Sequence, residues 1–177
     1  MEPLVWGLKK RGITYRGVIY AGLMMTDSGP YVLEFNVRMG DPETQPLLMR
    51  CTSDIVPVLH EVAHGARIKH MRIDSNRDPA VCVVMASEGY PGPVVKGRVI
   101  TGIAEAERID GVKVFHAGTT FKGGDIVTSG GRVLGVTATA GGIEAAIEKA
   151  YRAVSLISFE GMHYRTDIGR KAVGRLP

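Results

Sequence analysis

The sequence predicts an α+β fold in two parts, and three features of the chain indicate it. Residues 17–38 hold two apolar runs joined by a cluster of turn-forming residues, which is typical of an antiparallel hairpin. The run Asn-Arg-Asp-Pro at 76–79 marks a boundary, because short apolar segments separated by glycines follow it. The segment at about 142–158 carries one continuous apolar stripe and predicts a closing helix. We therefore expect one domain over 1–75 and a second, strand-rich domain over 76–177.

The first part is expected to place helices around the hairpin. Asp41 is the predicted N-cap of one helix, because aspartate is favoured there and Pro42 is favoured at the first helical position. Another helix is expected to start after Ser53 or Asp54 and to stop at Gly65. The helices of this part are expected at 2–11, at 42–50 and up to His64, and the hairpin strands at 17–25 and 31–38.

The second part is expected to consist of short strands before its closing helix. Glycine turns separate its apolar segments, as is typical of a strand-rich domain. The strands are expected at 80–87, 97–103, 112–116, 125–128 and 132–139.

Composition excludes several classes of protein. The 177 residues are 45% hydrophobic, as in ordinary globular proteins, and no apolar run approaches the roughly 20 residues that span a bilayer. Only two cysteines, Cys51 and Cys82, are present, which is too few for a disulfide framework. The formal net charge of +4 comes from scattered basic residues, so we expect small anionic substrates rather than nucleic acid as partners. We expect a cytoplasmic protein without a membrane segment.

Residues 33–45, Leu-Glu-Phe-Asn-Val-Arg-Met-Gly-Asp-Pro-Glu-Thr-Gln, carry the strongest chemical signal. Side chains of a strand alternate between its faces, so Glu34, Asn36 and Arg38 are expected on one face. The apolar residues between them are expected to anchor the other face in a core. A carboxylate beside an amide oxygen suits Mg²⁺, and a guanidinium beside them suits an anion held by that metal. The row therefore predicts a phosphoryl-transfer site, although a solvated strand face in which Arg38 pairs with Glu34 would show the same residues.

The chain resembles the C-terminal part of the phosphoribosylamine–glycine ligases (glycinamide ribonucleotide synthetases), a family of ATP-grasp enzymes of purine biosynthesis. Residues 15–24 resemble a strand of the ATP-grasp domain, and the run from Glu34 to Gln45 resembles the signature of the family. Four later segments match in order, and Glu88 departs from the pattern, since the family commonly has a small residue there. The later segments are Gly89-Tyr90-Pro91-Gly92 with Lys96-Gly97, His116-Ala117-Gly118-Thr119, Gly131-Arg132-Val133-Leu134 and Tyr164-Arg165-Thr166-Asp167-Ile168-Gly169.

The resemblance implies an ATP-dependent ligase that joins glycine to 5-phosphoribosylamine through a glycyl phosphate. Under it, Glu34 and Asn36 would bind Mg²⁺ or Mn²⁺ at the ATP phosphates, and Arg38 would be catalytic by holding the transferred phosphoryl group. Asp41 and Glu43 would lie near the glycine ammonium, but helix capping explains the same residue types.

Other substrate contacts are expected from basic residues of the second part. Lys96 and Arg132 lie beside glycine turns and would reach the phosphate of phosphoribosylamine, although surface charges next to hairpins are as good an interpretation. His116 is a further candidate for the same cleft, and its alternative is a structural histidine at a strand end. Because the ATP-grasp lid and the lysine that binds ATP phosphates would precede residue 1, we expect the isolated chain to be inactive and to self-associate through its exposed strands.

A competing motif predicts a different class of enzyme. His60-Glu61-Val62-Ala63-His64 matches the H-E-x-x-H pattern of zinc metallopeptidases, with His70 at the spacing of a third ligand. Gly65 is expected to end the helix directly after His64, which leaves His70 beyond a turn. Solvent-facing histidines near a helix end are therefore the favoured interpretation.

A second alternative lies within the ATP-grasp enzymes. Biotin carboxylases also carry Glu-x-Asn-x-Arg on a strand, so the row of Glu34, Asn36 and Arg38 does not distinguish them. The following residues 40–45, Gly-Asp-Pro-Glu-Thr-Gln, fit the glycine ligases and not the carboxylases.

Overall fold

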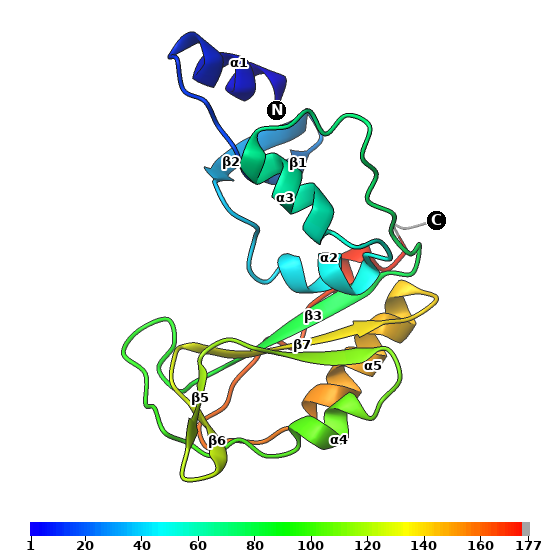
Figure 1. Ribbon diagram of the computed structural model, residues 1–177. Coiled ribbons are helices and arrows are strands. Elements are labelled where there is room, and N and C mark those ends of the chain that lie inside the picture. The colour runs from blue at the N-terminus through cyan, green and yellow to red at the C-terminus, as the bar shows by residue number, and fades with distance from the viewer. Residues whose placement is uncertain (175–177) are drawn as a thin grey trace. The chain divides into compact units, whose positions relative to one another are not determined.

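The structure is a computed structural model that describes residues 1–174, and it divides into two compact units (Figure 1). The hairpin unit comprises residues 1–41 and 52–74. The sheet unit comprises residues 42–51 and the chain from Ser75 onward. Both contain helices and antiparallel strands, which confirms the α+β class.

The hairpin unit is built from helix α1 (Glu2–Lys10), strands β1 (Tyr20–Thr26) and β2 (Gly29–Asn36), and helix α3 (Val56–His64). The two strands form an antiparallel sheet in which Thr26 pairs with Gly29, so the predicted hairpin is confirmed with a shorter turn. The Thr26 hydroxyl donates to the Gly29 carbonyl at 2.9 Å and accepts from the Ser28 N–H at 3.2 Å, which closes the turn.

The apolar face of β2 is not anchored in a core, and that expectation was wrong. Leu33, Phe35 and Val37 are 65%, 44% and 74% exposed, and no residue of β1 or β2 is buried. The register shifts between Gly22 and Leu23, which leaves an extra residue on β2 and kinks the ladder. A two-stranded sheet without a covering layer has no interior, because each face needs a packed neighbour to bury its side chains.

Two helices begin at other residues than predicted. Helix α2 (Thr44–Arg50) has Glu43 at its N-cap, so the assignment of the cap to Asp41 and of the first helical position to Pro42 was wrong. Asp41 and Pro42 instead form a turn before the helix. Ile55 occupies the N-cap of α3, while the Asp54 carboxylate accepts the Val56 N–H at 2.9 Å. Gly65 ends α3 in the left-handed conformation (φ 75°), as predicted.

The core of the molecule lies in the sheet unit, around the three-stranded antiparallel sheet β3-β7-β4. Its strands are β3 (Ala80–Ala86), β4 (Val112–His116) and β7 (Arg132–Thr139), and β7 is the central one. Helix α5 (Ile143–Val154) packs against the sheet, and its fully buried alanines at 146, 150 and 153 let it approach closely. Strands predicted at 80–87, 112–116 and 132–139 are thereby confirmed.

Helix α2 packs against β3 and β7 within the same unit. Gly135 lies at this contact: a Cβ there would be 3.6 Å from Gln45 Cγ of the helix, an ordinary packing distance, and 3.2 Å from Cys82 Sγ of β3. Because side chains alternate along β3, Cys82 faces α2 while Val81 and Val83 belong to the opposite face.

The segment predicted as a strand at 97–103 was assigned wrongly. It forms only isolated bridges at Val99 and Thr101, and helix α4 (Ile103–Glu107) begins inside it. Gly102 explains the change of direction: its φ is +83°, and a Cβ there would overlap the Leu156 carbonyl oxygen.

Smaller elements complete the sheet unit. Strand β6 (Asp125–Thr128) was predicted, whereas its partner β5 (Thr119–Lys122), α4 and the 3-10 turn at Arg170–Ala172 were not. Helix α5 ends at Val154, four residues earlier than predicted. Neither Cys51 nor Cys82 forms a disulfide, and no helix of the described residues is long and apolar enough to cross a membrane.

We expect the Glu107→Gln substitution to weaken the sheet unit at neutral pH. The Glu107 carboxylate lies 2.6 Å from Lys113 Nζ and accepts the Val114 N–H at 3.2 Å, and the bond from Lys113 is the main reason that the pKa of Glu107 lies below its ordinary value. A lowered pKa means that this stabilisation is present above the unfolded-state pKa and is lost as pH falls through the folded-state pKa. Since both side chains are partly exposed, the loss should be roughly 0.5–1 kcal/mol of the free energy of unfolding.

Urea denaturation followed across pH 3 to pH 7 measures this effect. The difference between wild type and E107Q should shrink toward the acid end of the range. Glu148→Gln is the matched control, because Glu148 is exposed on α5. An unchanged pH profile in E107Q would contradict the assignment.

Candidate functional site

The predicted metal-ligand pair is brought together on β2. Asn36 Nδ2 donates to Glu34 Oε1 at 2.9 Å, so both side chains lie on the same face at the end of the strand. This bond fixes the amide relative to the carboxylate and leaves Glu34 Oε2 and Asn36 Oδ1 as oxygen acceptors. Two adjacent oxygen ligands of this kind fit a hard divalent cation that takes its remaining ligands from water or substrate phosphates.

Gly22 of β1 makes room for the Glu34 side chain. The two residues are paired in the hairpin, and a Cβ at position 22 would lie 3.0 Å from Glu34 Cγ and 3.7 Å from Glu34 Oε1. Any larger residue there would have to displace the carboxylate. The ligand position is therefore set by both strands of the hairpin.

Arg38 lies beyond the end of β2, in a bend. Its guanidinium is exposed, and Nη1 donates to the carbonyl oxygen of Met39 at 2.9 Å rather than to Glu34. The alternation of side chains along a strand, which predicted Arg38 on the same face as Glu34 and Asn36, therefore does not apply to Arg38. Asp41 closes the first segment of the hairpin unit, and Glu43 caps α2 in the sheet unit without a side-chain capping bond.

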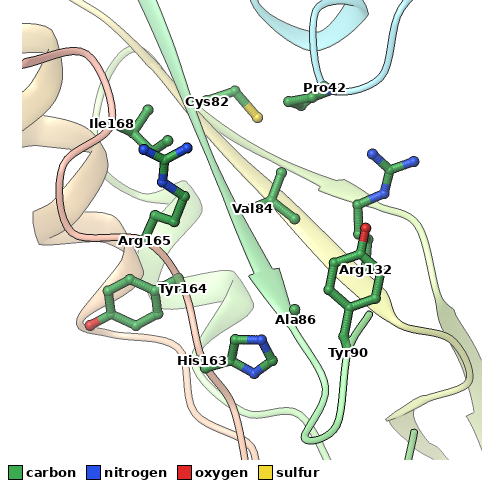
Figure 2. A pocket seen from close by; sticks show the side chains of 10 residues that line it. All are labelled: Pro42, Cys82, Val84, Ala86, Tyr90, Arg132, His163, Tyr164, Arg165 and Ile168. Carbon is green, nitrogen blue, oxygen red and sulfur yellow. The ribbon is translucent and has the colours of Figure 1, made fainter. Parts of the chain in front are cut away.

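A cavity of about 400 Å³ opens in the sheet unit (Figure 2). The apolar side chains of Cys82, Val84 and Ala86 on β3 form its floor. Arg132, at the start of β7, lines it, as Figure 2 shows. The other residues that line it are Pro42, Tyr90, His163, Tyr164, Arg165 and Ile168.

Close backbone packing forms the side of the cavity that carries Arg132. The Ser87 N–H donates to the Gly131 carbonyl and the Ser87 hydroxyl to the Gly130 carbonyl, both at 2.8 Å. A Cβ at Gly131 would lie only 2.4 Å from Tyr90 Cδ2, so the Tyr90 ring rests on the bare backbone beside Arg132. The glycine run is needed for this contact.

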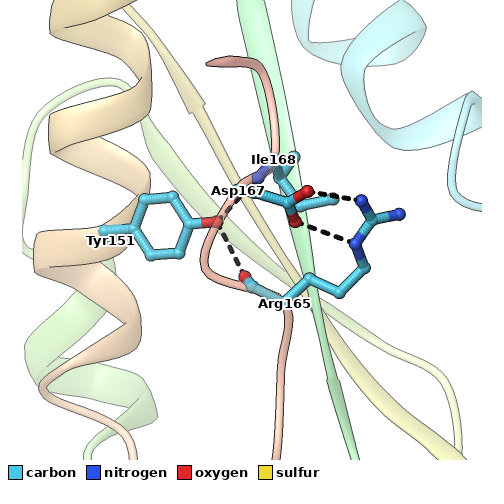
Figure 3. Close-up of polar contacts among 4 residues, drawn as sticks. All are labelled: Tyr151, Arg165, Asp167 and Ile168. Atoms are coloured by element: carbon cyan, nitrogen blue, oxygen red, sulfur yellow. Dashed lines mark hydrogen bonds and ion pairs between the residues drawn. The ribbon is translucent and has the colours of Figure 1, made fainter. Parts of the chain in front are cut away.

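The opposite side is formed by residues 163–168, which Tyr151 of α5 holds in place (Figure 3). The Tyr151 hydroxyl donates to the Arg165 carbonyl at 2.7 Å and accepts the Ile168 N–H at 3.0 Å. Arg165 contacts Asp167 through two parallel bonds, Nε to Oδ1 at 2.9 Å and Nη2 to Oδ2 at 2.7 Å. The bond from Arg165 lowers the pKa of Asp167, so this carboxylate stays ionised at neutral pH.

Two predicted basic contacts do not line this cavity. Lys96 is exposed in the connection that follows β3, and His116 is exposed at the end of β4, where its Nδ1 lies 3.0 Å from Thr119 Oγ1. His163 and Arg165 line it and were not among the predicted site residues, although Arg165 lies in the run from Tyr164 to Gly169 that resembles the family. The available signal was the run His-Tyr-Arg at 163–165, which places two basic side chains close to an aromatic one.

In the described residues, the histidines of the H-E-x-x-H motif have no third metal ligand beside them. The rings of His60 and His64 stack on α3 with centroids 4.2 Å apart, and His64 Nδ1 lies 2.9 Å from the His60 carbonyl. His70 lies in a turn beyond the helix. Within residues 1–174, no group of three or more His, Cys, Asp or Glu side chains is placed to hold a metal ion.

Comparison with known families now decides between the alternatives. The model of the "Phosphoribosylglycinamide synthetase, C domain" matches residues 80–171, and that of the "Phosphoribosylglycinamide synthetase, ATP-grasp (A) domain" matches residues 1–44. The chain belongs to the phosphoribosylglycinamide synthetase family. This family assignment argues against both the zinc metallopeptidase and the biotin carboxylase alternatives.

Comparison with individual proteins supports the same family assignment. A phosphoribosylamine–glycine ligase of Rhodopirellula baltica is 51% identical over 98% of this chain and 40% of its own length. The crystal structure of the phosphoribosylamine–glycine ligase of Thermotoga maritima superposes with a TM-score of 0.77 at 40% identity, over 92% of this chain and 39% of that one. The chain thus spans about 40% of the length of these relatives.

The fold extends beyond the family. The biotin carboxylase domain of the 2-oxoglutarate carboxylase of Hydrogenobacter thermophilus superposes with a TM-score of 0.60 at 21% identity, over 91% of this chain and 35% of that one. At this identity the likeness concerns the fold alone, and it supports an ATP-grasp fragment.

We expect the Gly22→Ala substitution to displace the Glu34 carboxylate without unfolding the hairpin. The backbone of Gly22 is not in the left-handed region, so alanine is tolerated there, but its Cβ would crowd Glu34 Cγ at 3.0 Å. The Asn36 side-chain amide signals in a ¹H–¹⁵N spectrum should shift, because the bond to Glu34 changes. Gly141→Ala is the control, since nothing lies within 4 Å of a Cβ there. Unmoved Asn36 amide signals in G22A would contradict this account.

Proposed function

We propose that this chain is the metal- and substrate-binding part of an ATP-dependent ligase that joins glycine to 5-phosphoribosylamine. The observation that carries the proposal is the pair Glu34–Asn36, held side by side on β2 in a chain of the phosphoribosylglycinamide synthetase family. In this reaction the terminal phosphoryl group of ATP passes to the glycine carboxylate, which gives ADP and glycyl phosphate. The amine of phosphoribosylamine then attacks the acyl carbon and releases phosphate.

Glu34 and Asn36 are the residues that would hold the divalent metal, Mg²⁺ or Mn²⁺, which when bound neutralises charge on the ATP phosphates. Their oxygen-only donor set supports a hard cation over zinc. We propose Arg38 as the catalytic cation beside them, with its guanidinium contacting the transferred phosphoryl group. Its exposure and its single bond to a neighbouring carbonyl leave further N–H groups for such a contact.

The remaining assignments concern the two small substrates. We propose Asp41 and Glu43 as contacts of the glycine ammonium, because carboxylates at a turn that is at least partly exposed can accept from an ammonium group. Arg132 and Lys96 are the proposed contacts of the phosphoribosyl phosphate, and the cavity supports Arg132 more strongly than Lys96. We further infer a cytoplasmic enzyme, and two cysteines that form no disulfide are consistent with a reducing compartment.

A chimaera tests the proposed function directly. Replacing the matching segment of the Rhodopirellula baltica relative with this chain should give an enzyme whose ATP hydrolysis requires both glycine and phosphoribosylamine. Asn36→Leu should abolish turnover in that chimaera, because it removes an oxygen ligand and the bond to Glu34. Losses of about 10²-fold or more in kcat are expected when phosphoryl-transfer groups are misplaced.

Asn36→Asp is the matched variant in that experiment, since it keeps an oxygen at the ligand position. It should retain measurable turnover and need a higher metal concentration than the unsubstituted chimaera. Equal activity of N36L and the unsubstituted chimaera would refute the metal assignment. A chimaera that folds but hydrolyses ATP without glycine would refute the ligase itself.

We also propose that the isolated chain self-associates through the hairpin. Leu33 of β2 and Val37 directly after it are 65% and 74% exposed, and a two-stranded sheet leaves its strand edges open to pairing. Light scattering at increasing concentration should show dimers or larger species. The double variant Leu33→Lys, Val37→Lys should shift the population toward monomer by about tenfold or more in dissociation constant, and a wild type that stays monomeric at millimolar concentration would disprove the proposal.

A further inference from the structure

The cavity of the sheet unit has the size and lining of a site for a small anion. Its volume of about 400 Å³ lies in the range of small-molecule sites. Of the ten residues that line it, Arg132, His163 and Arg165 are basic and none is acidic. A guanidinium presents N–H groups in a plane that matches the oxygens of a phosphate. The apolar floor on β3 and the Tyr90 ring offer non-polar surface to the rest of a ligand.

Arg165 is held in one orientation although its side chain is 70% exposed. The two bonds to Asp167 use Nε and Nη2, so the plane of the guanidinium is fixed and Nη1 is left to meet a ligand. An arginine ordered before binding loses less side-chain entropy when the ligand arrives.

Tyr151 orders the backbone that carries Arg165, although it does not itself line the cavity. One hydroxyl bonds both the Arg165 carbonyl and the Ile168 N–H, so it closes the segment 165–168 into a fixed loop. The helix that supplies this hydroxyl is anchored in the core, where Ala150 and Val154 are fully buried. Tyr151 thus connects the backbone of Arg165 to the core. The neighbouring Tyr164 and Ile168 also pack against that core.

We propose that this cavity binds a sugar phosphate, that Arg165 contacts its phosphate group, and that Tyr151 is a positioning residue for Arg165. The choice of a sugar phosphate rests on the proposed function, in which one substrate is a phosphorylated pentose. The preference for a phosphate monoester rests on the lining of the cavity alone.

Binding of ribose 5-phosphate to the 177-residue chain, followed by NMR titration, tests the site. Saturable shifts are expected at Ala86, Arg132 and Arg165, and ribose at the same concentrations should give none. Arg165→Lys keeps the positive charge but loses the planar guanidinium that can donate two parallel N–H bonds, and it should raise the Kd by about tenfold. Shifts confined to residues outside the cavity, or an unchanged Kd in R165K, would overturn the site.

Tyr151→Phe tests the positioning role, because phenylalanine keeps the ring and removes only the hydroxyl. The substitution removes both bonds of the hydroxyl, and it should raise the Kd by about fivefold and shift or broaden the Arg165 Nε–H signal. Tyr15→Phe is the matched control, since the Tyr15 hydroxyl donates to the Val18 carbonyl at the same 2.7 Å in the hairpin unit. A purely structural role would lower the melting temperature of Y151F but leave the Kd and the Arg165 signal unchanged, and that result would overturn the positioning role.

Failure of this inference is distinguishable from failure of the proposed ligase. A chimaera without ligase activity, together with ribose 5-phosphate binding that R165K weakens, would refute the ligase and support the cavity. An active chimaera, together with a chain that shows no saturable ribose 5-phosphate shifts, would refute the cavity alone.

Discussion

The pairing of β7 with both β3 and β4 is the constraint on which the sheet unit depends. β7 is the central strand, and its residues from Val133 to Ala138 are all buried. Burial on both faces forces the register, because a slip of one residue would exchange every side chain between the two faces. That register places Cys82, Val84 and Ala86 in the cavity floor and sets Arg132 at the edge where β7 begins. The chemistry at the cavity is thus fixed by apolar packing that takes no part in it.

In the hairpin unit, side-chain positions are not fixed by a buried core. None of the residues in β1 and β2 is buried, so no core fixes Glu34 and Asn36. Their geometry comes from local contacts: the cross-strand space left by Gly22, and the bond from the Asn36 amide to the carboxylate. Local contacts of this strength contribute about 1 kcal/mol each, which is enough to orient a side chain and too little to resist a bulky neighbour. A ligand pair on such an element is sensitive to substitutions that would be neutral elsewhere.

The sequence was a good guide where periodicity and local chemistry decide the outcome. The buried runs of β3 and β7, the apolar stripe of α5 and the glycine stop at Gly65 follow from residue type alone. The pairing of Glu34 with Asn36 followed from strand alternation, and it held because both residues lie within the strand. Arg38 lies outside it, where alternation has no meaning.

Other features depended on long-range contacts that no local pattern encodes. The segment 97–103 has the composition of a strand, but Gly102 approaches the Leu156 carbonyl, more than fifty residues away, and the chain turns there. Helix α2 follows the hairpin in the chain but packs within the sheet unit, where Gln45 lies over Gly135 of β7. The wall of the cavity needed Tyr151 to meet Arg165 and Ile168. Each contact becomes visible only when the fold brings its partners together.

The oxygen pair of Glu34 and Asn36 and the cavity with Arg165 are therefore held in place by different kinds of contact. The oxygen pair on β2 is set by neighbours on its own hairpin, whereas Arg165 is set through Tyr151 by a helix whose inner face is fully buried. Loosening the core of the sheet unit should thus disturb the cavity and leave the oxygen pair intact, because Glu34 and Asn36 belong to the hairpin unit and are not members of that core. Conversely, a larger residue at position 22 should displace Glu34 and leave the cavity intact, because the crowding occurs within the hairpin. Under the proposed function, the oxygen pair would serve the metal and the cavity would serve the sugar phosphate, and each of these two places has its own structural support.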